Sequence, residues 1–288
     1  MQYFGNVYRP PSEAMSLILQ VTLGCSNNSC RFCPMYKGES FQVRREEEVF
    51  SDIEELAAGR PWFSRVFLAD GDSLVLSTNR LLRLLRKLKA SFPNLERISA
   101  YTTAKDLLRK SVADLRQLKA EGLDMVYVGL ESGSDRILQE VDKRITVEEM
   151  KEGCLRAREG GLRTSVTLIA GLGGREGWRE NARESAKLIS EIQPDFVAYL
   201  TLNLTPGTPL YEDAQRGKFS MPGPEEIAWE LREFLLHVDS PGSIFRANHA
   251  SNYVNLKGTL NEDREVMVRE IEEALREGNF KPEEYRLL

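Results

Sequence analysis

The chain has 288 residues, of which 41% are hydrophobic, enough to form one large core or two modest cores. A formal net charge of −5 excludes the strongly basic composition that is typical of nucleic-acid-binding proteins, and no apolar run approaches the roughly 20 residues that span a bilayer. The first residues lack a basic segment followed by an apolar one, so we expect a cytoplasmic protein.

Six strand-like runs alternate with helical stretches or loops along the first two thirds of the chain. They cover residues 16–23, 65–70, 97–103, 124–131, 162–171 and 195–204. Several are nearly continuous apolar runs, which is typical of parallel strands covered on both faces. Because right-handed crossovers wind such units into an open or closed barrel, the pattern predicts an α/β fold, a partial (β/α)6 TIM-like barrel.

The alternation stops after Pro206. A helix is predicted over 223–238, an irregular polar stretch over 241–260 and a last helix from near Asn261. We therefore expect an N-terminal extension over 1–14, a core barrel over 15–210 and a C-terminal helical and irregular extension over 211–288 that closes the barrel.

Three of the four cysteines lie in one loop after the first predicted strand. Cys25, Cys30 and Cys33 have the spacing Cys-x4-Cys-x2-Cys, which favours a metal or catalytic role in an intracellular chain. A structural zinc site needs four protein ligands, but Cys154 falls on the apolar face of a predicted helix and neither histidine is placed near the loop. A [4Fe–4S] cluster held by three cysteines fits better, because one iron stays open to another ligand.

Residues with functional chemistry also follow the other predicted strands. In a barrel of this kind the site lies at the carboxyl ends of the strands. The residues at or just past these ends are Cys25, Asp70, Thr102, Glu131, Gly171 and Asn203.

The cysteine loop resembles that of the radical S-adenosylmethionine (SAM) superfamily. In that family three cysteines after the first barrel strand hold a [4Fe–4S] cluster, and SAM binds the fourth iron. The usual spacing is Cys-x3-Cys-x2-Cys, so this chain has one extra residue between Cys25 and Cys30. Phe32 matches the aromatic residue beside the adenine, although it could instead be a core residue that anchors the loop.

The resemblance covers most of residues 15–210. Within the superfamily, the chain is similar to the branch that contains the elongator catalytic subunit, the methylthiotransferases and the oxygen-independent coproporphyrinogen oxidase. It implies that Asp70, Gly71 and Asp72, which stand where the family carries Gly-Gly-Glu, take the SAM amino group. The same three residues also make a common turn. In "VGLESGSDRIL", Glu131 and Ser132 would approach the SAM methionyl group or ribose hydroxyls.

Two further motifs complete the implied cofactor site. Arg144 in "DKRITVEE" would pair with the SAM carboxylate, or it is a surface residue near a helix start. Ile169 and Gly171 match the adenine motif Gly-x-Ile-x-Gly-x-x-Glu, in which Thr167 and Gly174 replace the first Gly and the final Glu.

The resemblance implies a radical SAM enzyme, an oxidoreductase or transferase with a [4Fe–4S] cluster and SAM as cofactors. The cluster would cleave SAM reductively to a 5′-deoxyadenosyl radical, which takes hydrogen from an unidentified small-molecule substrate. No catalytic side chain is expected beyond the cluster cysteines. A flavodoxin or ferredoxin would supply the electron, and we expect neither a nucleic-acid partner nor a membrane span.

Two other functions stay open at this point. A SAM-binding heme or Fe–S chaperone would share the motifs without catalysing a radical reaction, and a non-catalytic Fe–S electron carrier would need only the cysteines. Only Cys154 is left for an auxiliary cluster, which argues against a methylthiotransferase.

The tail over 246–257 is rich in hydrogen-bonding side chains. It could close the barrel and contact substrate through His249, Asn252 and Tyr253. The alternative is a loop packed by its own polar bonds.

Overall fold

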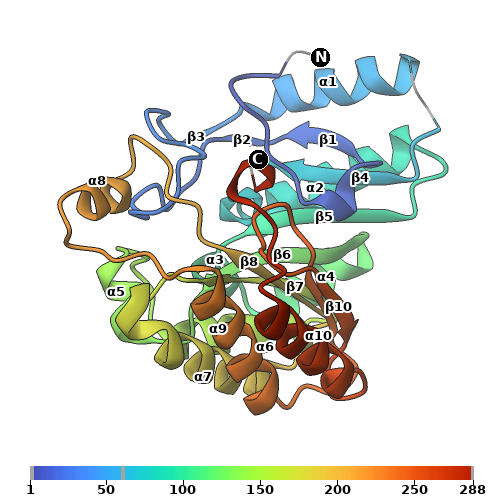
Figure 1. Cartoon of the computed structure of the whole chain (residues 1–288). Coiled ribbons are helices and arrows are strands. Elements are labelled where there is room, and N and C mark those ends of the chain that lie inside the picture. The colour runs from blue at the N-terminus through green and yellow to red at the C-terminus, as the bar shows by residue number, and fades with distance from the viewer. Residues whose placement is uncertain (1–2, 60–61, 287–288) are drawn as a thin grey trace. The chain divides into compact units, whose positions relative to one another are not determined.

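The computed structural model describes residues 3–59 and 62–286, and its chain forms two compact units (Figure 1). The first unit contains Met1–Asn28, Met35–Val128 and Glu152–Thr164. The second contains Ser29–Pro34, Gly129–Lys151 and Ser165–Leu288. Each unit is described by itself.

The first unit is built on parallel strands in the order β1-β4-β5-β6. Its elements are η1 (Pro11–Glu13), β1 (Leu17–Gln20), β2 (Thr22–Leu23), β3 (Gln42–Val43), α1 (Glu46–Gly59), β4 (Arg65–Ala69), η2 (Ser73–Val75), α2 (Thr78–Ser91), β5 (Arg97–Thr102), α3 (Ala104–Leu108) and α4 (Val112–Ala120). Three elements pass from one unit to the other: β6 (Leu123–Glu131), α6 (Val147–Glu159) and β7 (Arg163–Ala170).

The apolar periodicity of α2 explains how the helix packs. Ser77 caps its start by accepting a hydrogen bond from the Arg80 backbone, and the buried side is formed by Leu81, Leu84, Leu85 and Leu88. The strand predicted over 16–23 is interrupted after Gln20, so that β2 pairs with β3 in an antiparallel ribbon instead of extending β1.

The second unit has parallel strands in the order β7-β8-β9, to which β10 adds an antiparallel strand. Its elements are α5 (Asp135–Glu140), α7 (Gly174–Ile192), β8 (Phe196–Thr201), α8 (Pro209–Gln215), α9 (Pro224–His237), β9 (Ile244–Ala247), β10 (Leu256–Thr259), α10 (Arg264–Glu277) and η3 (Glu283–Tyr285). Helix α9 lies between α7 and α10 (Figure 1).

The mostly parallel α/β fold is as predicted. The prediction of an irregular stretch over 241–260 is wrong, because this segment contains β9 and β10. Phe245 and Ala247 are buried and Arg246 between them is exposed, so the segment alternates as a strand with one buried face. The short alternation was hidden by the polar residues around it. The boundaries at residues 14 and 210 stay a prediction.

No helix among residues 3–59 and 62–286 is long and apolar enough to cross a bilayer.

Candidate functional site

In the first unit the start of the cysteine loop packs against the turn at 70–72. The Gly71 backbone N–H donates to the Gly24 carbonyl at 3.1 Å. A Cβ atom at Gly71 would lie 3.0 Å from Cys25 Cβ and 2.9 Å from a ring carbon of Tyr36. Such contacts leave room for glycine alone, so the first predicted cluster ligand and the predicted site for the SAM amino group touch each other.

Two acidic side chains beside this turn affect each other's pKa. Asp72 is fully buried, and it accepts a hydrogen bond from the Ser26 hydroxyl. Burial and the neighbouring Asp106 carboxyl raise the pKa of Asp72 to about 8. Burial would raise the pKa of Asp106 too, but the neighbouring Asp72 and the hydrogen bonds from Thr103 and Arg109 outweigh it and lower that pKa. Burial and the neighbouring carboxyl thus favour the neutral form of Asp72.

Asp70 is also buried, and residues of β1 and β2 form hydrogen bonds with it. Gln20 Nε2 donates to Asp70 Oδ2 at 2.9 Å, and the Asp70 backbone N–H donates to Thr22 Oγ1 at 3.2 Å. Burial raises the pKa of Asp70 to about 6. Its Oδ1 has no hydrogen-bond partner among the described residues, so one acceptor is left for a ligand.

The other two cysteines of the loop lie in the second unit, where the segment 29–34 is attached at several points. The Arg31 backbone N–H donates to the Val141 carbonyl at 2.9 Å, and the Arg31 carbonyl accepts from Leu210 N–H at 3.0 Å. The Arg31 guanidinium forms an ion pair with Asp213 of α8. Cys30 and Cys33 are thus carried on a backbone that is fixed from both sides.

Phe32 and Ile169, the two predicted adenine contacts with apolar side chains, pack against one apolar cluster in the second unit. Its buried members are Ile137, Val141, Leu172, Leu202 and Leu210. Phe32 therefore anchors the loop on the same cluster as Ile169, and its place beside the adenine stays a prediction.

The donor set fits an iron–sulfur cluster better than a closed zinc site. None of the four cysteines forms a disulfide, and the three in the loop are divided between the two units. Cys154 is buried, and burial raises the pKa of its thiol to about 12, as expected of a core residue. In the described ranges no three His, Cys, Asp or Glu side chains already form a metal-binding group, and the assignment of Cys25, Cys30 and Cys33 as ligands stays a prediction.

Lys143 and Arg144, two adjacent cations that follow β6 and α5, differ in exposure and in their partners. Lys143 Nζ lies 2.8 Å from Glu131 Oε1, and the exposed fractions of these side chains are 15% and 11%. Arg144 is 62% exposed and donates twice to Asp142 at 2.9 Å. The sequence interpretation selected Arg144, and its pairing with the SAM carboxylate stays a prediction. Lys143 is the less exposed of the two cations and contacts Glu131, a predicted SAM residue.

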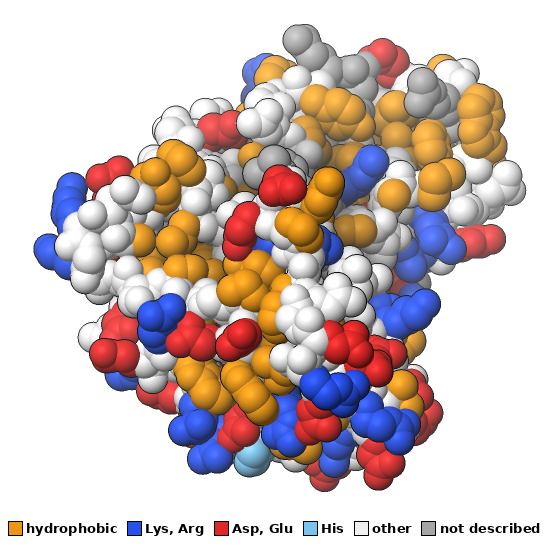
Figure 2. Space-filling view, viewed as in Figure 1, with side chains coloured by type: hydrophobic (Ala, Val, Ile, Leu, Met, Phe, Trp, Pro, Cys, Tyr) orange, Lys and Arg blue, Asp and Glu red, His pale blue; other side chains and the backbone are white. Residues whose placement is uncertain are grey.

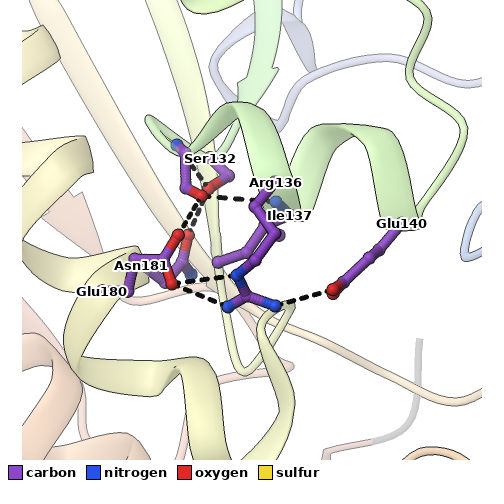
Figure 3. Close-up of polar contacts among 7 residues, drawn as sticks. Ser132, Arg136, Ile137, Glu140, Glu180 and Asn181 are labelled. Atoms are coloured by element: carbon purple, nitrogen blue, oxygen red, sulfur yellow. Dashed lines mark hydrogen bonds and ion pairs between the residues drawn. The ribbon is translucent and has the colours of Figure 1, made fainter.

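Ser132 is fully buried, and its hydroxyl donates to Asn181 Oδ1 at 2.5 Å (Figure 3). Asn181 Nδ2 donates to the Ile169 carbonyl at 2.9 Å and to Glu230 Oε1 at 2.7 Å. Glu230 Oε2 in turn accepts from the Gly171 backbone N–H at 2.9 Å. Neither Asn181 on α7 nor Glu230 on α9 was identified from the sequence, because nothing local to either helix marks a functional residue.

In the tail the polar groups of the predicted substrate residues have partners within the protein. Asn252 Oδ1 accepts from Thr201 Oγ1 and its Nδ2 donates to the Tyr199 carbonyl, both at 2.9 Å. The Tyr253 hydroxyl donates to Glu283, and the Arg286 guanidinium lies 3.7 Å from the centre of the Tyr253 ring. These partners lie outside the tail over 246–257, so the contacts attach the tail to β8 and to the segment at 283–286.

His249 is half-buried in the same tail and is bonded to Ser251 Oγ at 2.9 Å through Nδ1. Burial lowers its pKa, so the imidazole is neutral at pH 7. The substrate role of His249, Asn252 and Tyr253 stays a prediction.

Charged side chains on the helices of the second unit are mixed in sign. Figure 2 shows Lys and Arg interspersed with Asp and Glu over α9 and α10. Three ion pairs account for part of the pattern: Arg175–Glu226, Arg183–Glu233 and Arg232–Glu272. The face shown therefore lacks the single-sign basic surface that a nucleic acid would need.

Comparison with known families gives a match over more than half of the chain. The sequence pattern of the "Radical SAM superfamily" matches residues 19–186. The match includes the cysteine loop, the turn at 70–72, the end of β6 and the end of β7.

Curated relatives are more distant. A tRNA-2-methylthio-N(6)-dimethylallyladenosine synthase from Ehrlichia chaffeensis is 25% identical over 214 residues, which are 70% of this chain and 46% of the relative. The enzyme of the same name from Ehrlichia canis is 26% identical over 208 residues, 69% of this chain and 46% of the relative. The chain thus spans less than half the length of these relatives.

Solved structures agree in fold. Coproporphyrinogen III oxidase from Escherichia coli, described as a radical SAM enzyme, superposes with a TM-score of 0.57 at 21% identity over 77% of this chain and 52% of its own. Methylornithine synthase superposes with a TM-score of 0.56 at 18% identity over 89% of this chain and 68% of its own.

Proposed function

Since the chain belongs to the radical SAM superfamily, whose enzymes bind a [4Fe–4S] cluster and SAM, we propose that it uses SAM to remove a hydrogen atom from a small-molecule substrate. When bound and reduced, the cluster supplies the electron that cleaves SAM to methionine and a 5′-deoxyadenosyl radical. Cys25, Cys30 and Cys33 would hold the cluster. A flavodoxin or ferredoxin would deliver the electron.

The observation that carries the proposal is the packing of Cys25 against Gly71. This packing places the start of the cysteine loop directly against the turn that ends in Asp72. A cluster held by Cys25 would lie beside this turn, and the acidic groups of the turn would receive the amino group of SAM. A cysteine loop that served only electron transfer would not need this acidic turn.

The acidic groups can receive an ammonium group without leaving charge unpaired in the free protein. Burial and the neighbouring Asp106 raise the pKa of Asp72, which favours a proton on this carboxyl in the free protein. On binding, the SAM ammonium can replace that proton as the partner of the carboxylates. Asp70 Oδ1 offers a further acceptor nearby in the sequence.

A small-molecule substrate is supported by charge. The chain has a net charge of −5, and the helices shown in Figure 2 carry mixed charges. The curated relatives are named for a tRNA modification, so an RNA substrate is the competing proposal. Binding of an RNA hairpin at physiological salt would favour that competitor.

We expect the anaerobically reconstituted and reduced protein to convert SAM to 5′-deoxyadenosine, at a slow uncoupled rate without substrate. Liquid chromatography of the quenched mixture measures this product, and protein from which the cluster has been chelated is the control. If tetrapyrrole binds stoichiometrically and no 5′-deoxyadenosine forms, the chaperone alternative replaces the proposal. If SAM is neither bound nor cleaved, the electron-carrier alternative replaces the proposal.

A further inference from the structure

We propose that Asn181 is a positioning residue that ties the end of β6 to the end of β7 and so sets the adenosine side of the SAM site. The inference rests on the proposed function, since Ser132, Ile169 and Gly171 are the predicted cofactor residues at these two ends. Asn181 itself lies on α7, outside every motif that the sequence offered.

The oxygen and the nitrogen of the Asn181 side-chain amide both have partners within the protein. Its oxygen accepts from the Ser132 hydroxyl at 2.5 Å, and its nitrogen donates to the Ile169 carbonyl at 2.9 Å and to Glu230 at 2.7 Å. The side chain is fully buried. Three directed bonds at one buried amide therefore fix Ser132 and Ile169 relative to each other.

Glu230 extends the same connection by one residue. Its second oxygen accepts from the Gly171 backbone N–H at 2.9 Å, so both predicted adenine residues of β7 are reached from Asn181. Glu230 is fully buried as well, and its position depends on the bond from Asn181. Ser132, Asn181 and Glu230 are all buried, so water cannot replace a hydrogen bond that is lost from this network.

The backbone of the turn after β6 also packs directly against helix α7. The Gly133 N–H donates to Ser185 Oγ at 2.9 Å, and a Cβ atom at Gly133 would lie 2.2 Å from the Glu184 carbonyl oxygen. Only glycine permits this approach. Since the turn already rests on α7, a small change at Asn181 shifts side chains and not the whole helix.

This geometry assigns Ser132 an indirect role. Its hydroxyl proton is committed to Asn181, and its oxygen accepts from the Ser134 N–H at 3.1 Å. Figure 3 shows the Ser132 side chain directed at Asn181. Ser132 therefore affects SAM through Asn181 and not by a contact of its own.

The test is a double-mutant cycle on SAM affinity in the reconstituted protein, read from the SAM-dependent change in the electron paramagnetic resonance spectrum of the reduced cluster. Ser132→Ala should raise the SAM concentration at half-saturation about tenfold and Asn181→Leu about thirtyfold, as expected from the loss of one and of several buried bonds. In the Asn181→Leu background, Ser132→Ala should add less than about twofold, because its partner is already gone. The spectrum at saturating SAM should equal that of wild type, since the iron side of the site is unchanged.

Ser240→Ala is the matched control. Ser240 is a buried serine of the same unit, and its hydroxyl bonds to Ser243 Oγ at 2.7 Å. It should lower thermal stability as Ser132→Ala does, with half-saturation unchanged. Asn181→Ala serves as a second variant with the same expectation should Asn181→Leu fail to assemble the cluster.

Additive effects of the two substitutions would overturn the inference, because Ser132 would then contact SAM directly. An unchanged half-saturation in the Asn181 variants would overturn it too. Failure of the proposed function is distinct from both, since the wild-type spectrum itself would then not respond to SAM.

Discussion

Replacing Cys25, Cys30 or Cys33 by alanine is expected to abolish cluster assembly. Anaerobic reconstitution of the wild-type chain should give about four irons and four sulfides, and each single variant should retain less than about a tenth of that content. The reason is that the loop offers three thiolates and no spare one. Iron and sulfide analysis together with the charge-transfer absorbance of the protein measures the loss.

Cys154→Ala is the control for this series. Its thiol is buried in the core, and burial raises its pKa to about 12, so it is neither a thiolate nor near the loop in the sequence. Full cluster content is expected in this variant. Stoichiometric zinc in the wild type without charge-transfer absorbance, or full iron content after removal of any one loop cysteine, would contradict the assignment.

Asp72→Asn is expected to weaken SAM binding by about 10- to 100-fold, because the SAM ammonium would lose an ionised partner. In the wild type, affinity should rise with pH up to about 8. The carboxyl must give up its proton to pair with the ammonium, and burial together with Asp106 raises the pKa of Asp72 to about 8. The Asn variant should lack this pH dependence. Calorimetric titration with SAM between pH 6.5 and 8.5 measures both effects.

The same substitution should act on stability in the opposite direction. A folded-state pKa above the unfolded value means that the native state binds the extra proton, so this group's contribution to stability is present below about pH 4 and is lost as the pH rises through 8. Asparagine needs no proton to stay neutral. The melting temperature of the cluster-free variant should therefore exceed that of wild type at pH 8.5 and approach it at pH 5.

Arg144→Ala is the contrasting variant. The Arg144 side chain is largely exposed and already paired with Asp142, so water can replace much of what is lost. A change in SAM affinity below about threefold is expected. If Asp72→Asn leaves affinity unchanged and Arg144→Ala does not, the turn at 70–72 is structural and the cofactor contacts lie at the end of β6.

The parts of the site that could be predicted are those encoded in short stretches. The cysteine spacing, the acidic turn after β4 and the ends of β6 and β7 each keep their residues within a few positions, and strand ends follow from apolar runs.

The parts that could not be predicted depend on which helix meets which strand end. Asn181 and Glu230 lie on α7 and α9, and their periodicity identifies only a buried face. Asp106 changes the protonation of Asp72 from a helix that follows the next strand. No local pattern encodes such pairs, because they are created by packing over long sequence separations.

The extension after β8 shows the same limit in secondary structure. Strand β9 has four residues, and its pairing with β8 supplies a stability that its own sequence does not.

The central claim is that the three-cysteine cluster of this chain is a SAM site. Electron paramagnetic resonance of the reduced, reconstituted protein with and without saturating SAM tests it most directly. A changed spectrum, which returns to the SAM-free form when SAM is removed by gel filtration, is the predicted result, because SAM would occupy the iron that Cys25, Cys30 and Cys33 leave open. A spectrum identical with and without SAM, in protein that carries a full complement of iron and sulfide, would contradict it.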